Sequence, residues 1–128
     1  MSDMEIKKNK DIAVLISPPL DGCVPNDVRT WLREQHETDA AIAEAMSKVG
    51  MKAGWLMHEL DDPDNDEKAL QKYHEEFDMW YELEKELVKE IVRRLGIEKV
   101  EKGWHYIIEP FMNKNGYRDG AGWWIKEE

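Results

Sequence analysis

Two pairs of acidic residues have a spacing that suits the binding of a divalent metal ion. Glu34 and Glu37 form the first pair and Glu59 and Asp62 the second, with 21 residues between the pairs. Residues three positions apart lie on one face of a helix, so each pair can present two carboxylates together. Mg²⁺ prefers carboxylate oxygens and keeps water molecules that can take part in hydrolysis. The spacing therefore indicates one candidate magnesium site.

This ExxE…ExxD pattern resembles that of the MazG-like all-α nucleotide pyrophosphohydrolases. In that family four carboxylates project from two packed helices and hold magnesium against a nucleotide triphosphate. The resemblance implies a magnesium-dependent hydrolase that uses Glu34, Glu37, Glu59 and Asp62. It covers 29 residues, and Asp62 departs from the pattern because it precedes Pro63, which places it at the end of a helix. We keep this enzyme as the alternative function.

The strongest compositional signal is negative charge gathered in one quarter of the chain. The 128 residues carry a net charge of −10 at pH 7. Residues 59–90 hold thirteen acids against four lysines, a balance of −9, which leaves −1 for the rest of the chain. Charge concentrated in this way can steer a positively charged partner toward the protein.

The candidate partner-binding surface consists of acids in a turn and along one edge of the helix that follows it. They are Asp61, Asp62, Asp64 and Asp66 in the turn and Glu75, Asp78, Glu82 and Glu86, at helical spacings, on the helix. An array of carboxylates can take the place of nucleic-acid phosphates in a basic groove. The composition is similar to that of small acidic proteins of phages and mobile elements, including anti-CRISPR proteins. The leading interpretation is a non-enzymatic inhibitor or immunity-type protein that blocks a basic, nucleic-acid-handling protein.

The C-terminal segment adds a second candidate surface. Three glycines precede the adjacent tryptophans Trp123 and Trp124 and allow the backbone to turn tightly. In a strand, neighbouring side chains point to opposite faces, so one ring can cover the core while the other faces outward. Tyr117, Arg118 and Trp124 would then form a recognition patch, because aromatic residues and arginine dominate binding hot spots. The alternative is that both rings close the end of the core.

Several classes of protein are disfavoured. The longest apolar run is the five residues 12–16, far too short to span a membrane. The N-terminus lacks the apolar region of a secretory signal, and the single cysteine, Cys23, cannot form an internal disulfide, so we expect a cytoplasmic protein. The segment 42–60 faintly resembles a helix-turn-helix, but its second half offers only Lys52 to phosphates, so direct nucleic-acid binding is not expected. No metal or cofactor motif is found around the four histidines, and the oligomeric state stays open.

Helices should form most of the domain. Caps and apolar periodicity predict helices over about 27–36, 38–60 and 66–95, the last two as an antiparallel pair. Gly50 and Gly54 weaken the second helix, so either another helix packs closely there or the helix breaks.

A small sheet is expected from the two ends of the chain. Residues 11–17 read as a buried strand, 104–109 as an edge strand that could also be a short helix, and 123–126 as a returning strand after a turn at 113–116. The sequence thus predicts a single α+β domain over 1–128, with a flexible start at 1–10.

Overall fold

The computed structural model describes residues 22–97, 104–120 and 124–127. The protein belongs to the α+β class, as expected: it combines helices with a small antiparallel sheet. In chain order the elements are α2 (Pro25–Glu34), α3 (Asp39–Leu60), α4 (Glu67–Leu95), α5 (Trp104–Ile107), α6 (Glu109–Lys114), β1 (Tyr117–Asp119) and β2 (Trp124–Lys126). The flexible start expected at 1–10 and the strand expected at 11–17 lie outside the described residues.

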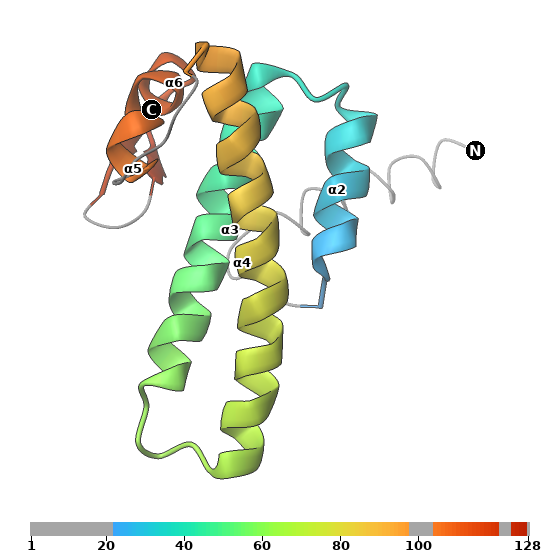
Figure 1. Ribbon diagram of the computed structural model, residues 1–128, viewed down its shortest axis with the longest axis vertical. Coiled ribbons are helices and arrows are strands. Elements are labelled where there is room, and N and C mark those ends of the chain that lie inside the picture. The colour runs from blue at the N-terminus through green and yellow to red at the C-terminus, as the bar shows by residue number, and fades with distance from the viewer. Residues whose placement is uncertain (1–21, 98–103, 121–123, 128) are drawn as a thin grey trace.

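The two longest helices, α3 and α4, form the antiparallel pair that the sequence predicts (Figure 1). The side chains of Thr38 and Asp66 each accept a hydrogen bond from the backbone N–H three residues later, and so they begin α3 and α4. Gly96 ends α4 in a left-handed conformation with φ 74°, which glycine adopts without strain. Both helices keep their predicted bounds to within one residue. In the described part of the chain no helix is long and apolar enough to cross a membrane.

Helix α3 runs without a break through Gly50 and Gly54, which resolves the question that the two glycines raise. A Cβ atom at Gly50 would lie 3.3 Å from the Glu84 Oε2 of α4, so the close approach of α4 explains this glycine. A Cβ atom at Gly54 would meet nothing within 4 Å. Gly54 therefore borders open space, and helix packing does not account for it.

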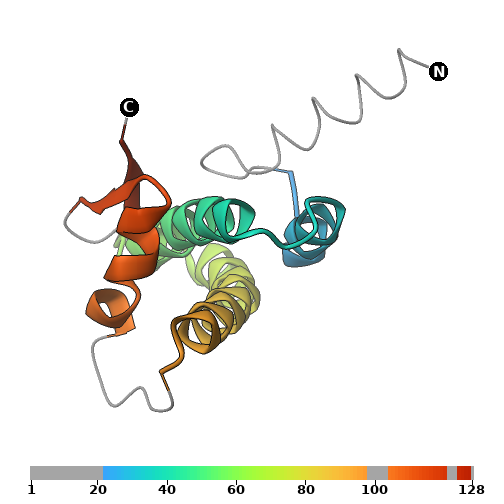
Figure 2. The ribbon, with the colours of Figure 1, turned by 90° about the horizontal axis from the view of Figure 1, so that it is seen from above.

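The core lies between the helix pair and two flanking parts (Figure 2), α2 on one side and the C-terminal elements on the other. Its largest fully buried side chains come from α2, α3, α4 and the C-terminal region. They are Val28, Ile42, Met46, Val49, Leu56, Leu83, Ile91, Ile108 and Met112. Helix α2 begins two residues earlier than expected because Pro25 suits the first turn of a helix, where no N–H is needed.

The C-terminal region differs from the prediction. The edge strand expected at 104–109 is wrong: these residues contribute to α5 and α6, the helical alternative. Pro110 is tolerated because it occupies the first turn of α6. Residues 124–126 of the strand expected at 123–126 form β2, but it pairs with β1 at 117–119, so both strands of the described sheet come from the C-terminal region.

Candidate functional site

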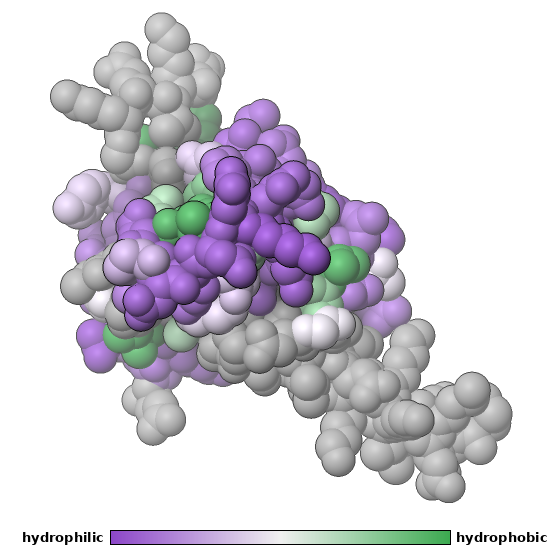
Figure 3. Space-filling view, turned by 90° about the horizontal axis from the view of Figure 1, so that it is seen from below, coloured by the Kyte–Doolittle hydropathy of each residue, from purple (hydrophilic) through white to green (hydrophobic). Residues whose placement is uncertain are grey.

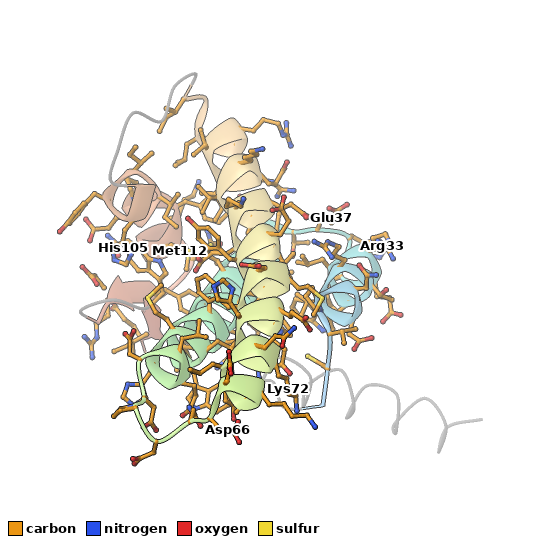
Figure 4. The ribbon with its side chains drawn as sticks, turned by 60° about the horizontal axis from the view of Figure 1, so that its bottom comes forward. Arg33, Glu37, Asp66, Lys72, His105 and Met112 are labelled. Atoms are coloured by element: carbon orange, nitrogen blue, oxygen red, sulfur yellow. The ribbon has the colours of Figure 1, made fainter. Side chains whose placement is uncertain are left out.

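The four carboxylates of the candidate magnesium site do not come together. Glu34 and Glu37 precede the start of α3, whereas Glu59 and Asp62 lie at its end. A helix of 22 residues is about 33 Å long at 1.5 Å per residue, so one ion cannot contact both pairs. Figure 4 likewise shows Glu37 well away from Asp66, which caps the other long helix at the hairpin loop. The four residues therefore do not form the MazG-like site of the alternative function, and the described residues contain no group of three or more potential ligands that could hold a metal ion.

The acids predicted along one edge of α4 are all exposed, but part of their charge is already neutralised within the molecule. Glu86 accepts hydrogen bonds from the Arg29 Nε (3.0 Å) and Nη2 (2.5 Å) of α2. The Glu82 Oε2 lies 3.0 Å from the Nζ atom of Lys85. Asp78 and Glu82 also line a hollow beside the start of α2. Glu86 thus helps to hold α2 against α4 and Glu82 is paired with Lys85, so we leave both out of the partner-binding surface.

Arginine is absent from the end of the helix pair that contains the α3–α4 loop. We call residues 59–78, the end of α3, the loop and the start of α4, the acidic tip; it holds nine acids and two lysines, a net charge of −7. All five arginines lie outside it. Three of them form ion pairs outside the acidic tip: Arg29 with Glu86, Arg93 with Glu90, and Arg94 with Glu90 and Asp39.

Within the acidic tip, the described residues form one ion pair, between the exposed side chains of His74 and Asp78 at 3.7 Å. The loop acids Asp61 and Asp64 are exposed, and Asp62 is half-buried and accepts a hydrogen bond from the backbone of Asp64. Seen from the loop end, this face is largely hydrophilic, with a few apolar side chains between (Figure 3). Most of the carboxylates of the tip therefore remain available to a partner.

The predicted recognition patch at the C-terminal segment is wrong for two of its three residues. Tyr117 is 4% exposed and Trp124 is 2% exposed, while Arg118 is exposed. The register of β1 and β2 explains this, because it puts both rings on the same face of the sheet, against the core. The carbonyl of Trp124 also accepts a hydrogen bond from the Ser47 hydroxyl of α3 at 2.7 Å. Trp123 lies outside the described residues.

A cleft that the sequence does not suggest lies where α3, α4 and α5 meet. Its volume is about 300 Å³. The lining residues are Gly50, Ala53, Gly54 and Met57 from α3, Phe77, Tyr81 and Glu84 from α4, and His105 from α5. The cleft thus joins small residues on one wall to aromatic rings on another, with a carboxyl group and an imidazole among its lining side chains.

Glu84 is a buried acid whose pKa is strongly raised. Its residue is 8% exposed, and burial raises the pKa of its carboxyl group from 4.5 to about 7. No ion pair or hydrogen bond compensates for this burial among the described residues. A carboxyl group that titrates near neutral pH can exchange a proton or receive a cation, and perturbed groups in clefts are candidates for functional sites.

His105 is fixed on the opposite side of the cleft by contacts with the C-terminal sheet. Its ring stacks on Trp124 with a centroid distance of 4.2 Å, and its Nε2 atom lies 3.1 Å from the Oδ1 atom of Asp119. Figure 4 shows His105 among the C-terminal elements that flank the helix pair. His105 thus faces the carboxylate of Asp119, which leaves Glu84 as the carboxyl group of the cleft without an ion pair among the described residues.

The sequence does contain a signal for Glu84. Phe77, Glu84 and Ile91 follow one another at intervals of seven, so Glu84 falls in the same line as two apolar residues of the buried stripe. Counting Glu84 only as one of the thirteen acids of residues 59–90 overlooks this position. An acid in register with core residues is a feature that sequence reasoning can find.

Comparison of the chain with protein-family models, curated proteins and solved structures gives no match in any of the three. The acidic tip and the Glu84 cleft are therefore interpreted from their own geometry and charge.

Proposed function

We propose that this protein is a non-enzymatic binding protein that engages a basic protein surface through its acidic tip. Its partner would be a nucleic-acid-handling protein whose phosphate-binding surface the tip occupies, as in an inhibitor or an immunity-type protein. A cytoplasmic location is part of this proposal, because such a partner acts where nucleic acid is found.

The observation that carries the proposal is the separation of arginines from acids along the helix pair. The tip has nine acids, two lysines and no arginine, whereas the arginines near the other half are engaged in ion pairs. Solubility alone does not require charge of one sign to be gathered in this way, because mixed charges serve it equally well. A concentrated negative potential raises association rates with basic surfaces and repels nucleic acid itself.

The acidic tip consists of the end of α3, the start of α4 and the loop between them, so the two helices hold its carboxylates in place. Asp66 stays at the start of α4 because it caps the helix, and its negative charge is favourable at a helix N-terminus. Glu67 follows in the first turn for the same electrostatic reason. These acids therefore stabilise the fold and contribute to the potential at once.

Charge reversal with a matched control tests the proposal. The variant Asp64→Lys with Glu75→Lys changes two exposed acids of the tip, and the control Glu37→Lys with Glu127→Lys changes two exposed acids elsewhere by the same total charge. Each immobilised protein is incubated with cell lysate at low and high salt, and captured proteins are challenged with double-stranded DNA. We expect capture by the native and control proteins, weakened by salt and reversed by DNA, and little capture by the tip variant.

Equal capture by the tip variant and the control would overturn the proposal, because it would make the position of the charge irrelevant. So would retention of the captured proteins against excess DNA, since a protein held through its phosphate-binding surface must compete with phosphates.

A further inference from the structure

We propose that the cleft between α3, α4 and α5 is a binding site for an arginine side chain of the partner, with Glu84 as the counter-ion of the guanidinium group. This proposal rests on the proposed function, which brings a basic surface to the helix pair, and it assigns one specific contact in that complex. Four parts of the cleft and its surroundings support this assignment: an unpartnered acid, an open wall, aromatic faces and a compatible charge environment.

Glu84 is the first part. Its residue is more than nine-tenths buried, yet the described structure gives its carboxylate no ion pair and no hydrogen bond, and burial alone accounts for its perturbation. Buried acids are ordinarily paired, because an uncompensated charge away from water is costly. Glu84 lines the cleft, so a cation that enters can supply the missing partner.

The wall formed by α3 is the second part. A side chain at Gly50 would press on the Oε2 atom of Glu84, since even its Cβ would come within 3.3 Å. A side chain at Gly54 would project into open space that the cleft now occupies. Both positions lie inside a continuous helix, where glycine is unfavourable, and both keep the approach to the carboxylate open.

The aromatic wall is the third part and favours arginine over other cations. The rings of Phe77 and Tyr81 are stacked with a centroid distance of 5.5 Å and an interplanar angle of 12°. A planar guanidinium group stacks on such rings and forms two parallel hydrogen bonds with one carboxylate, which a lysine ammonium group cannot do. Cations already contact rings in this region: the Nζ of Lys85 lies 5.2 Å from the centroid of the Tyr81 ring of this wall, and that of Lys52 lies 4.8 Å from the centroid of the Trp55 ring.

The remaining charges around Glu84 are the fourth part. Helix α3 contributes no titratable residue to the cleft, α4 contributes Tyr81 besides Glu84, and α5 contributes His105, which lies 3.1 Å from Asp119 of β1. Near and below neutral pH a guanidinium group must displace the proton of Glu84, whose pKa is about 7. Affinity should therefore rise by about tenfold per pH unit as the pH approaches 7 from below and level off above it.

Binding of a small probe tests the site without the partner. N-acetyl-argininamide is titrated into the purified protein and followed by amide NMR shifts, with the uncharged N-acetyl-citrullinamide as the comparison ligand. We expect saturable shifts at Gly50, Gly54 and His105 for the arginine compound alone. Glu84→Gln should lower the affinity by about tenfold or more at pH 8 and remove most of its pH dependence.

Two further variants separate the site from general attraction to an acidic protein. Gly54→Leu should block binding while the protein stays folded, because leucine favours the helix and fills the open space. Glu127→Gln removes an exposed acid outside both the acidic tip and the cleft and should leave binding unchanged.

Equal affinity for the two ligands, or undiminished binding by Glu84→Gln, would overturn the assignment. Those results concern the cleft alone, because the acidic-tip variants are judged by protein capture and DNA competition. Failure of the capture experiment would overturn the proposed function, whereas the titration alone decides whether the cleft binds arginine.

Discussion

Replacing Glu84 by glutamine should stabilise the protein at high pH and have little effect on the pH-independent part of its stability. Glutamine has nearly the shape of glutamate and removes only the charge. Burial raises the folded-state pKa of Glu84 from 4.5 to about 7, so the folded protein binds this proton more tightly than the unfolded chain. The favourable contribution of Glu84 is therefore complete below pH 4.5 and is lost as the pH rises through 7.

The size of this stability effect follows from the pKa shift of Glu84. A change from 4.5 to about 7 corresponds to about 3 kcal/mol between the two ends of this range. The stability of Glu84→Gln relative to the native protein should thus increase by about this amount between pH 4.5 and about pH 9. The difference between the two proteins is the useful quantity, because the histidines and the other acids titrate in both.

Urea unfolding followed by tryptophan fluorescence measures this difference at a series of pH values. Glu75→Gln, an exposed acid on the same helix, serves as the control and should give a nearly constant difference. A constant difference for Glu84→Gln across the range would refute the reasoning, because it would mean that Glu84 ionises as easily in the folded protein as in the unfolded chain. The reasoning would also be refuted if Glu84→Gln were more stable than the native protein at low pH and lost this advantage at high pH.

Two further predictions concern local features of the helix pair. Gly54→Ala should stabilise the protein by up to about 1 kcal/mol, since alanine favours the helix and its Cβ meets nothing within 4 Å. Gly50→Ala should stabilise it less, because its Cβ approaches the carboxylate of Glu84. Urea unfolding of both variants measures the difference. Asp66→Ala should cost about 1 kcal/mol, because it removes the side chain that caps α4; Asp66→Asn, measured by the same unfolding experiment, should recover most of the loss.

The helices could be predicted from the sequence because their signals are local. The apolar stripe from Leu70 to Leu95, a cap at Asp66 and a glycine at position 96 all indicate the same helix, and α4 has those bounds. Agreement between periodicity and caps leaves little for distant contacts to decide. The same agreement at Thr38 and Leu60 defines α3.

The C-terminal region could not be predicted in this way, because its residues satisfy two patterns. Residues 104–109 alternate as a strand would, yet Ile108, Phe111 and Met112 also lie on one helical face. The deciding factor is tertiary: these three side chains are buried in the common core, and the helices α5 and α6 bring them there. Periodicity over so short a segment does not contain that information.

The sequence predicts only part of the candidate functional site, because the rest depends on contacts between segments that are far apart in the chain. Composition identifies the acids of the tip, because charge density is a property of the sequence. It does not show that Arg29 of α2 reaches Glu86, since 57 residues separate them along the chain. Nor does it reveal a cleft, because the cleft exists only where α5 is placed beside the helix pair.

The cleft has a further property that bears on its role: Gly54 at any pH, and Glu84 above neutral pH, should lower the stability of the protein. A leucine in place of Glu84 would continue the apolar stripe, and an alanine in place of Gly54 would strengthen α3, so a sequence shaped by folding alone has reason to contain neither glutamate nor glycine here. Gly50 can be explained as room for the Glu84 carboxylate, but Gly54 touches nothing. Local departures of this kind are expected at functional sites. Substitutions that fill or neutralise the cleft should therefore raise the stability of the protein and abolish arginine binding together. A purely structural role for these residues does not predict this combination.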